Sequence, residues 1–249
     1  MGELDGKVAV ITGAGSGMAR ASARAFVREG AQVLGADISG REQETAAELG
    51  DAFVAFHADV RNEPDVEAML AAAVDAFGRI DAVLNVAGVG SMQPLADVNL
   101  DDYERVMAIN LRGVMLGTKH AIRAMLETGG GLILNWASAA GLNASHLPVS
   151  TYAATKAGVI AITKAAAVEY GPQGIRANVI CPGGVIVTEM TGGRAAVERH
   201  RGLVEGVPLK RAGEPEEIAE LACFLASDRA TFITGAVIPI DGGQSAVLA

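Results

Sequence analysis

The chain has 249 residues, of which half are apolar, a fifth charged and only 4% aromatic, and its formal net charge is −9. This apolar fraction excludes a disordered chain, and the length suits one large α/β domain or two small ones. The acidic balance disfavours nucleic acid and anionic membrane surfaces as primary partners, because both would repel the chain.

The remaining composition signals concern the compartment. The N-terminal residues lack the apolar segment of a secretory signal, and no apolar run reaches the roughly 20 residues that a bilayer span needs. Cys181 and Cys223 lie far apart in apolar segments, a pattern typical of buried thiols in a reducing compartment. The sequence therefore predicts a cytoplasmic protein with neither disulfides nor a metal centre.

Short apolar runs typical of buried parallel strands alternate with helical patterns along the whole chain. The predicted strands are residues 7–12, 32–37, 52–57, 82–86, 132–136, 176–181 and 236–240. One clear helix follows Asn62 and Pro64, and another follows Pro215. The alternation predicts an α/β fold with a doubly wound sheet of about seven parallel strands, in which ligands bind beyond the carboxyl ends of the strands.

The first predicted strand runs into a glycine-rich turn with Gly13, Ser16, Gly17 and Met18, and this turn opens a helix. Glycines let the backbone bend tightly and approach a pyrophosphate, whose charge the helix N-terminus stabilises. Any tight strand–helix turn can use glycine, so the glycines alone indicate little. Their position between a predicted strand and a predicted helix is what favours a dinucleotide site.

Asp37 ends the second strand 20 residues after Gly17, the spacing at which a carboxylate accepts hydrogen bonds from the adenosine ribose. A carboxylate at this position repels a 2′-phosphate, and neither Ser16 nor Ile38 supplies a cation, so the sequence favours NAD over NADP as cofactor. The competing interpretation makes Asp37 a helix N-cap.

Two further strand ends carry candidate cofactor contacts. Asp59, followed by Val60, either hydrogen-bonds an adenine or caps the next helix. Asn85, Ala87 and Gly88 follow the fourth strand, where small residues let a cofactor lie close to the backbone.

Four polar residues form the candidate catalytic set. Tyr152 and Lys156 are four apart on a predicted helix, so they share one face. A nearby ammonium lowers the pKa of a phenol, which then exchanges a proton with an alcohol or a ketone near neutral pH. Ser138 follows the fifth strand and is placed to hydrogen-bond the same substrate oxygen, and Asn110 is a buried amide that needs partners. The competing interpretation is an ordinary surface pair of Tyr152 and Lys156.

Taken together, these motifs resemble the classical short-chain dehydrogenase/reductase family. The resemblance runs from Leu4 to Gly243 and also includes Pro182-Gly183 and the sequence Asp241-Gly-Gly. It implies a single Rossmann domain over residues 1–249 and a homotetramer or dimer.

The resemblance also implies roles. Tyr152 would be the general acid/base, Lys156 would lower its pKa and bind the nicotinamide ribose, Ser138 would position the substrate oxygen, and Asn110 would hold a water. The implied cofactor contacts are Gly13, Ser16, Gly17, Met18, Asp37, Asp59, Val60, Asn85, Ala87, Gly88, Tyr152, Lys156, Pro182, Gly183, Val185 and Thr188.

The substrate is expected between the loop after Gly88 and the segments 139–149 and 185–206, in a mostly apolar pocket. Paired glycines at 192 and 193 suit the hinge of a substrate lid at about 188–206. His146 and Arg194 either contact a polar group of the substrate or are solvated, and the solvated state is favoured for both.

The leading function hypothesis is hydride transfer between NAD(H) and a secondary alcohol or ketone. The first alternative is an NADPH-dependent 3-oxoacyl thioester (acyl-carrier-protein) reductase, against which Asp37 argues. The second is a dinucleotide-binding regulator without turnover, which the set Asn110, Ser138, Tyr152 and Lys156 makes a poor fit.

Overall fold

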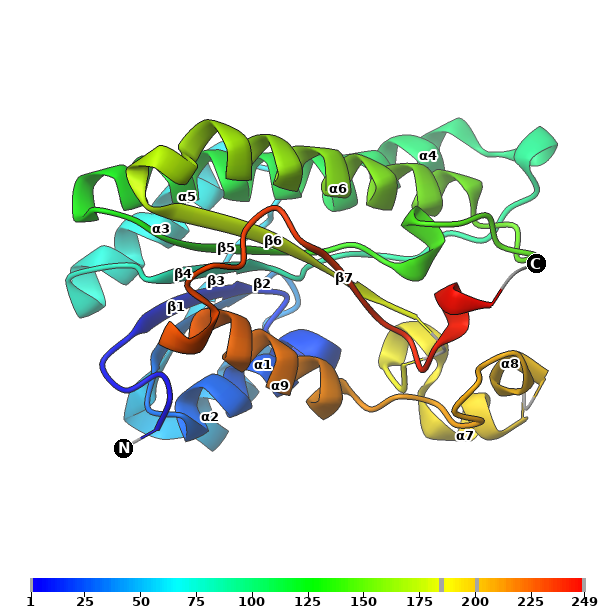
Figure 1. The fold of residues 1–249 in the computed structure, drawn as a ribbon, viewed down its shortest axis with the longest axis horizontal. Helices are drawn as coiled ribbons and strands as arrows, with labels where there is room; N and C mark the ends of the chain where they lie inside the picture. The colour runs from blue at the N-terminus through cyan, green and yellow to red at the C-terminus, as the bar shows by residue number, and fades with distance from the viewer. Residues whose placement is uncertain (1, 184–185, 200–201, 248–249) are drawn as a thin grey trace.

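One parallel sheet of seven strands organises the chain in a computed structural model that describes residues 2–183, 186–199 and 202–247 (Figure 1). Its strand order is β3-β2-β1-β4-β5-β6-β7. The strands are β1 Val8–Thr12, β2 Gln32–Asp37, β3 Phe53–His57, β4 Ala82–Asn85, β5 Gly131–Trp136, β6 Ile175–Pro182 and β7 Val237–Ile240. The doubly wound parallel sheet expected from the sequence is thereby confirmed.

Helices cover both faces of the sheet (Figure 1). They are α1 Gly17–Arg28, α2 Glu42–Leu49, α3 Glu63–Phe77, α4 Leu100–Met107, α5 Gly113–Thr128, α6 Ser150–Tyr170, α7 Gly193–Arg199, α8 Gly202–Glu205 and α9 Pro215–Ala226. Helices α3, α5 and α6 lie on one face, and α1, α2 and α9 lie on the other. Within the described residues, no helix is both long and apolar enough for a membrane span.

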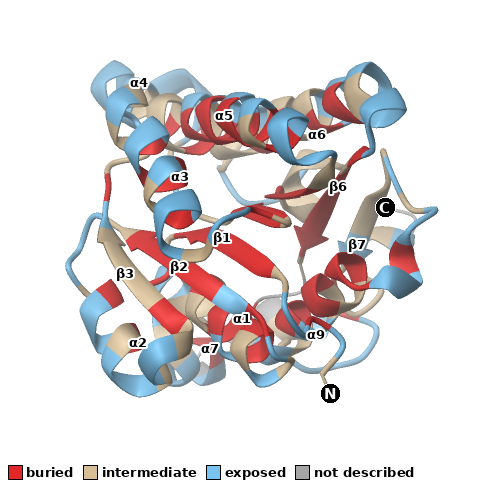
Figure 2. Cartoon of the chain, turned by 90° about the vertical axis from the view of Figure 1, so that its left-hand side faces the viewer, coloured by how far each residue is buried: buried red, intermediate tan, exposed pale blue. Residues whose placement is uncertain are grey.

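The strands have apolar side chains on both faces because helices cover both faces. All five residues of β1 are buried: Ala9 and Ile11 pack in the same apolar cluster as Phe26 of α1, whereas Val10 packs with Met69 of α3. Figure 2 shows the result as buried inner strands between helices whose outer surfaces are exposed. This two-sided burial explains why the strands were recognisable as continuous apolar runs.

The chain reverses direction across the sheet at β1. It proceeds outward from β1 to β2 and β3, then returns to place β4 on the other side of β1. The Thr12 hydroxyl accepts hydrogen bonds from the backbone N–H groups of Val86 and Ala87, at 3.1 and 3.2 Å, and so ties the two strand ends together. Such a switch point opens a crevice at the carboxyl ends of the strands.

Candidate active site

A cavity of about 920 Å³ opens at this switch point. Its walls come from the glycine-rich turn, the ends of β2, β3 and β4, the start of α6, and the segment after β6. The lining includes these residues expected from the sequence: Gly13, Ser16, Gly17, Met18, Asp37, Asp59, Val60, Ala87, Gly88, Tyr152 and Thr188.

The glycine-rich turn leaves room where side chains would fill the cavity wall. Gly13 has a φ of 79°, a left-handed conformation that favours glycine, and a Cβ there would lie 3.1 Å from the Ala87 Cα. At Gly15, a Cβ would lie 3.0 Å from Asp37 Oδ2. Helix α1 begins at Gly17 with no acidic residue in its first turn, so its N-terminus presents a positive dipole end to the cavity. This cradle fits the pyrophosphate of a dinucleotide.

The carboxylates at the ends of β2 and β3 both line the cavity. Asp37 accepts the backbone N–H of Gly15 at 3.0 Å and that of Ser39 at 2.8 Å, and it is not the N-cap of α2, which is Arg41. Asp59 accepts the backbone N–H of Arg61 and also pairs with the Arg61 guanidinium at 2.6 Å. Asp59 therefore holds the following turn, whereas Asp37 braces the glycine-rich turn beside the cavity.

Tyr152, Ser138 and Lys156 meet at the end of β5. The Ser138 and Tyr152 side chains are hydrogen-bonded to each other. Lys156, one turn after Tyr152 on α6, is buried, lies 5.5 Å from the centre of the Tyr152 ring and donates a hydrogen bond of 2.8 Å to the Trp136 carbonyl. The arrangement presents a phenol to the cavity, with a hydroxyl beside it and an ammonium behind it.

The pKa of Tyr152 shifts in the direction opposite to that expected from the sequence. Burial raises the pKa of the phenol, and the hydrogen bond with Ser138 lowers it by less. Burial also lowers the pKa of Lys156 to about 8. The spacing of Tyr152 and Lys156 in the sequence indicates the attraction between ammonium and phenolate but not the desolvation that burial imposes on both groups.

Asn110 is fully buried and holds the strand-end loop after β4. It lies in a π-helical segment, Ala108–Arg112, between α4 and α5, rather than in a regular helix as expected. Its Oδ1 accepts the N–H of Val89 and its Nδ2 donates to the carbonyl of Val89, both at 2.8 Å, with a longer contact to Thr155 Oγ1 at 3.4 Å. Its side-chain amide therefore fixes the backbone next to Gly88.

Replacing Asn110 by alanine should lower the free energy of unfolding by about 1–3 kcal/mol, because the part-buried N–H and carbonyl of Val89 lose their partners. Thermal and urea unfolding measure this loss. Asn62→Ala is the matched control, since Asn62 is exposed and its amide bonds only Asp65. Equal effects of the two substitutions would contradict the structural role of Asn110.

Asn85, Lys156, Pro182 and Gly183, which were expected to contact the cofactor, do not line the large cavity. The Asn85 side chain is buried on the far side of β4, where its Nδ2 donates to Asn135 Oδ1 at 2.8 Å and its Oδ1 faces Gly117. Pro182 is buried at the end of β6, and Val185 lies outside the described residues.

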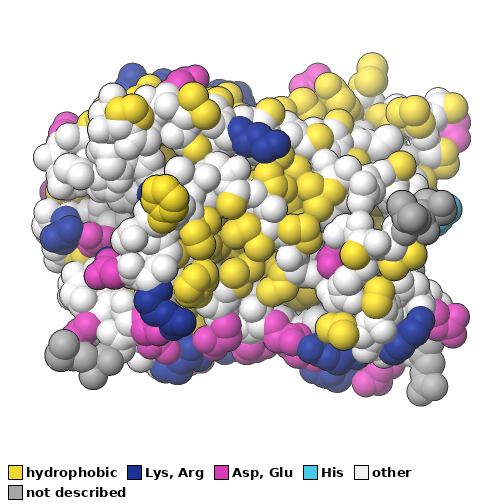
Figure 3. Space-filling model, viewed as in Figure 1, with side chains coloured by type: hydrophobic (Ala, Val, Ile, Leu, Met, Phe, Trp, Pro, Cys, Tyr) yellow, Lys and Arg dark blue, Asp and Glu magenta, His cyan; other side chains and the backbone are white. Residues whose placement is uncertain are grey.

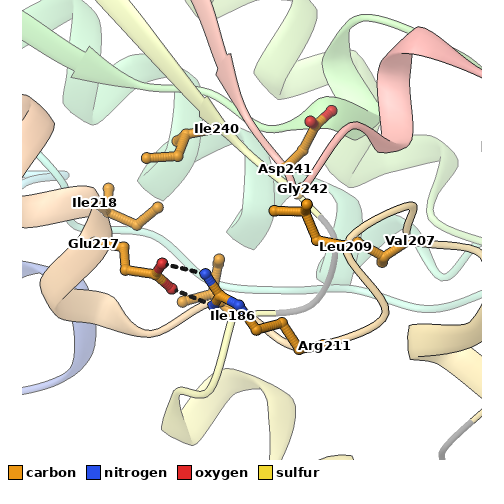
Figure 4. A pocket seen from close by; sticks show the side chains of 11 residues that line it. Ile186, Val207, Leu209, Arg211, Glu217, Ile218, Ile240, Asp241 and Gly242 are labelled. Atoms are coloured by element: carbon orange, nitrogen blue, oxygen red, sulfur yellow. Dashed lines mark hydrogen bonds and ion pairs between the residues drawn. The ribbon is translucent and has the colours of Figure 1, made fainter.

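Gly183 lines a separate, smaller cavity of about 110 Å³ at the ends of β6 and β7 (Figure 4). Ile186, Val207, Ile218 and Ile240 supply apolar walls, and the Arg211–Glu217 ion pair crosses it. At this size it holds a few waters at most, so the large cavity is the candidate site.

The cavity wall also contains residues that the sequence analysis missed. These are Arg41, Arg61, Arg105 and Ile109, whereas Val149, Glu189 and Met190 belong to the segments 139–149 and 185–206 that were expected around the substrate. Arg41 follows Asp37 by four residues, so proximity to a predicted strand end was the available signal. His146 is exposed and Arg194 pairs with Glu214 at 2.8 Å, and neither belongs to the cavity lining.

The fold and the cavity together define a dinucleotide-binding α/β protein. Comparison with known proteins narrows this class. A family model described as "Enoyl-(Acyl carrier protein) reductase" matches residues 13–245. The chain is 40% identical to 3beta-hydroxysteroid dehydrogenase 2 of Eggerthella lenta, over 98% of this chain and 96% of that protein. It is 42% identical to D-threitol dehydrogenase of Mycolicibacterium smegmatis, over 97% of this chain and 94% of that protein.

A solved structure agrees in fold as well as in sequence. The 3-ketoacyl-(acyl-carrier-protein) reductase from Brucella melitensis, complexed with NADH, superposes with a TM-score of 0.91 at 35% identity and covers 97% of this chain and 99% of its own. The chain belongs to the short-chain dehydrogenase/reductase family. It is an oxidoreductase of that family that interconverts an alcohol and a ketone with a nicotinamide cofactor.

Proposed function

We propose that this enzyme transfers a hydride between NAD(H) and a mostly apolar secondary alcohol or ketone, with Tyr152 as general acid/base. The observation that carries the proposal is the position of Tyr152, which lines the cavity together with Asp37 and the glycine-rich turn and has Ser138 and Lys156 beside it. The cavity wall therefore contains both a side chain that can transfer a proton, Tyr152, and a glycine-rich turn that fits a dinucleotide.

The proton steps belong to the residues of this chain. In the oxidation direction Tyr152 accepts the proton of the substrate hydroxyl, and in the reduction direction it donates this proton to the ketone oxygen. Ser138 donates a hydrogen bond that orients the same oxygen and favours the negative charge that develops on it. Lys156 is held in place by the Trp136 carbonyl, and while its amine is protonated it stabilises the phenolate form of Tyr152. A bound nicotinamide supplies the hydride acceptor or donor.

NAD is the proposed cofactor because Asp37 lines the cavity with a carboxylate directed at the glycine-rich turn. Such a carboxylate accepts hydrogen bonds from ribose hydroxyls and repels a 2′-phosphate. Gly13, Ser16, Gly17 and Met18 would hold the pyrophosphate, while Asp59, Val60, Ala87, Gly88, Tyr152, Lys156 and Thr188 would contact the rest of the cofactor. Asn85, Pro182 and Gly183 complete the proposed set through their backbone positions at or next to strand ends, and Val185, which lies outside the described residues, stays in the set as a prediction.

The substrate end of the cavity is apolar. The cavity that Tyr152 lines also has the apolar side chains of Met92, Ile109, Val149 and Met190 in its wall. Asp102, which lies behind the lining residues Ser91 and Arg105, accepts hydrogen bonds from Ser91, Gln93 and Arg105. These surroundings favour an uncharged substrate with a hydrocarbon body, which agrees with the steroid named for one relative.

The test is a panel of secondary alcohols and their ketones, comprising cyclic alcohols, steroids, sugars and 3-hydroxyacyl thioesters, assayed with NAD and NADP in parallel. Nucleotide reduction is followed by absorbance. We expect NAD to support turnover at least about tenfold better than NADP, and cyclic or steroidal alcohols to exceed sugars.

Two outcomes would contradict the proposal. Turnover only of 3-hydroxyacyl thioesters with NADP would instead support the acyl-carrier-protein reductase. Nucleotide binding without any turnover would support the non-catalytic regulator.

We also propose a homotetramer that buries two apolar surfaces, one over the edge strand β7 and one on the helices α5 and α6. Figure 3 shows hydrophobic side chains gathered across the middle of the molecule, over the edge strand β7. Phe232, just before β7, is fully exposed, and Val168 on α6 and Leu126 on α5 are exposed as well. Exposed apolar surface of this extent favours association.

The same proposal includes one domain over residues 1–249 with a substrate lid at about 188–206. It places the enzyme in the cytoplasm, where the buried thiols of Cys181 and Cys223 stay reduced.

A further inference from the structure

Arg41 stands beside the carboxylate that discriminates between the two nicotinamide dinucleotides. A Cβ built on Gly15 would lie 3.0 Å from both Arg41 Cβ and Asp37 Oδ2, so the Arg41 side chain leaves the backbone next to the Asp37 carboxylate. Both residues line the large cavity. A planar guanidinium in this position is the group that best recognises a phosphate.

The Arg41 guanidinium is nevertheless occupied by a residue from the other side of the cavity. Its Nη1 donates to Glu189 Oε2 at 2.6 Å, and Glu44 lies 4.0 Å from its Nε. Glu189 is the first residue of a short helix, Glu189–Thr191, that directly follows the cavity residue Thr188. The hydrogen bond with Glu189 is the main cause of the raised pKa of Arg41.

The ion pair between Arg41 and Glu189 changes the charges that the 2′-phosphate of NADP would encounter near Asp37. An NADP phosphate near Asp37 would need a cation to offset the repulsion from this carboxylate, and Arg41 is the nearby candidate. To use it, the phosphate would have to displace Glu189 and would also face the negative charge of Glu189 itself. NAD carries no such phosphate and leaves the pair intact.

We infer that Glu189 is a specificity-determining residue that withholds Arg41 from a 2′-phosphate and so strengthens the preference for NAD over NADP. The inference rests on the proposed use of a nicotinamide dinucleotide with its adenosine end at Asp37. By this inference the segment after β6, which contains Glu189 and is expected beside the substrate, also acts at the adenosine end of the cavity.

The ion pair is only partly shielded from water, which limits the expected effect. The Arg41 and Glu189 side chains are 38% and 64% exposed, and exposed pairs contribute little to stability. The effect on binding therefore comes mainly from whether the Arg41 guanidinium is free to pair with the phosphate, and it is largest at low ionic strength.

The test measures the dissociation constants of NADH and NADPH, without substrate, by calorimetry on the wild type, Glu189→Gln, Arg41→Gln and the double variant. For Glu189→Gln we expect the ratio of the NADPH constant to the NADH constant to fall about five- to tenfold. Arg41→Gln should raise this ratio, and in the double variant the gain from Glu189→Gln should disappear, because no guanidinium is left to release.

Arg194→Gln is the control, since it breaks another ion pair of the same segment outside the cavity lining and should leave the ratio unchanged. A ratio within about twofold of wild type in Glu189→Gln overturns the inference, as does an equal gain in the double variant. A wild type that prefers NADPH refutes the proposed NAD preference alone, because the comparison of the four proteins still decides the role of Glu189.

Discussion

Replacing Tyr152 by phenylalanine is expected to lower kcat/KM by about three orders of magnitude while NADH binding is retained. The substitution keeps the ring, which lines the cavity and packs beside Lys156, but removes the hydroxyl that moves the proton. General acid/base catalysis contributes about 10²- to 10⁴-fold to enzymatic rates. Initial rates with the best alcohol of the panel, together with calorimetric binding of NADH, measure both parts of this expectation.

Tyr170→Phe is the matched control, because Tyr170 is the last residue of the same helix, packs against an apolar cluster and does not line the cavity. It should leave the rate nearly unchanged. A Tyr152→Phe variant that retains more than about a tenth of the wild-type rate would contradict the proton-transfer role.

The second large effect concerns Lys156, for which methionine should increase stability and abolish most of the activity. Burial lowers the pKa of Lys156 from 10.5 to about 8, so at pH 7 the folded protein holds a buried ammonium at a cost in free energy. Methionine removes this cost but leaves the Trp136 carbonyl without its donor. The net gain in unfolding free energy at pH 7 should be about 2 kcal/mol.

The stability difference between wild type and Lys156→Met is expected to depend on pH in a defined direction. Below pH 8 the lysine is charged in both the folded and the unfolded chain, so the cost is present in full. As the pH rises from about 8 to 10.5, the folded protein loses this proton before the unfolded chain does, and the wild type gains stability relative to Lys156→Met. Thermal unfolding at pH 7 and 9.5 measures the difference, with the exposed Lys164→Met as control. A variant less stable than wild type at pH 7 would show that the ammonium is well compensated.

Much of the fold could be predicted because its physical cause is local. The inner strands are buried on both faces, so they stand out in the sequence as short apolar runs, and β2 begins and ends at the predicted residues. The parallel arrangement then brings the strand ends to one edge, which is why Gly13, Asp37 and Tyr152 line one cavity.

The remaining features depend on contacts that sequence spacing does not contain. The direction of the Tyr152 pKa follows from burial, which cannot be judged from the spacing to Lys156. Asn85 was expected at the cofactor, but side chains alternate along a strand, and its position turns it toward Asn135 and Gly117. The pairing of Arg41 with Glu189 joins distant parts of the chain and becomes visible only in three dimensions.

The hydrogen bond between Lys156 and the carbonyl of Trp136 has a practical spectroscopic consequence. Trp136 is the only tryptophan of the chain, and it is buried at the end of β5. The tryptophan fluorescence of the protein therefore originates from a single indole whose backbone holds the lysine of the candidate site. Nucleotide binding or substitution of Lys156 can be followed through this tryptophan emission without a label and without signal from a second tryptophan.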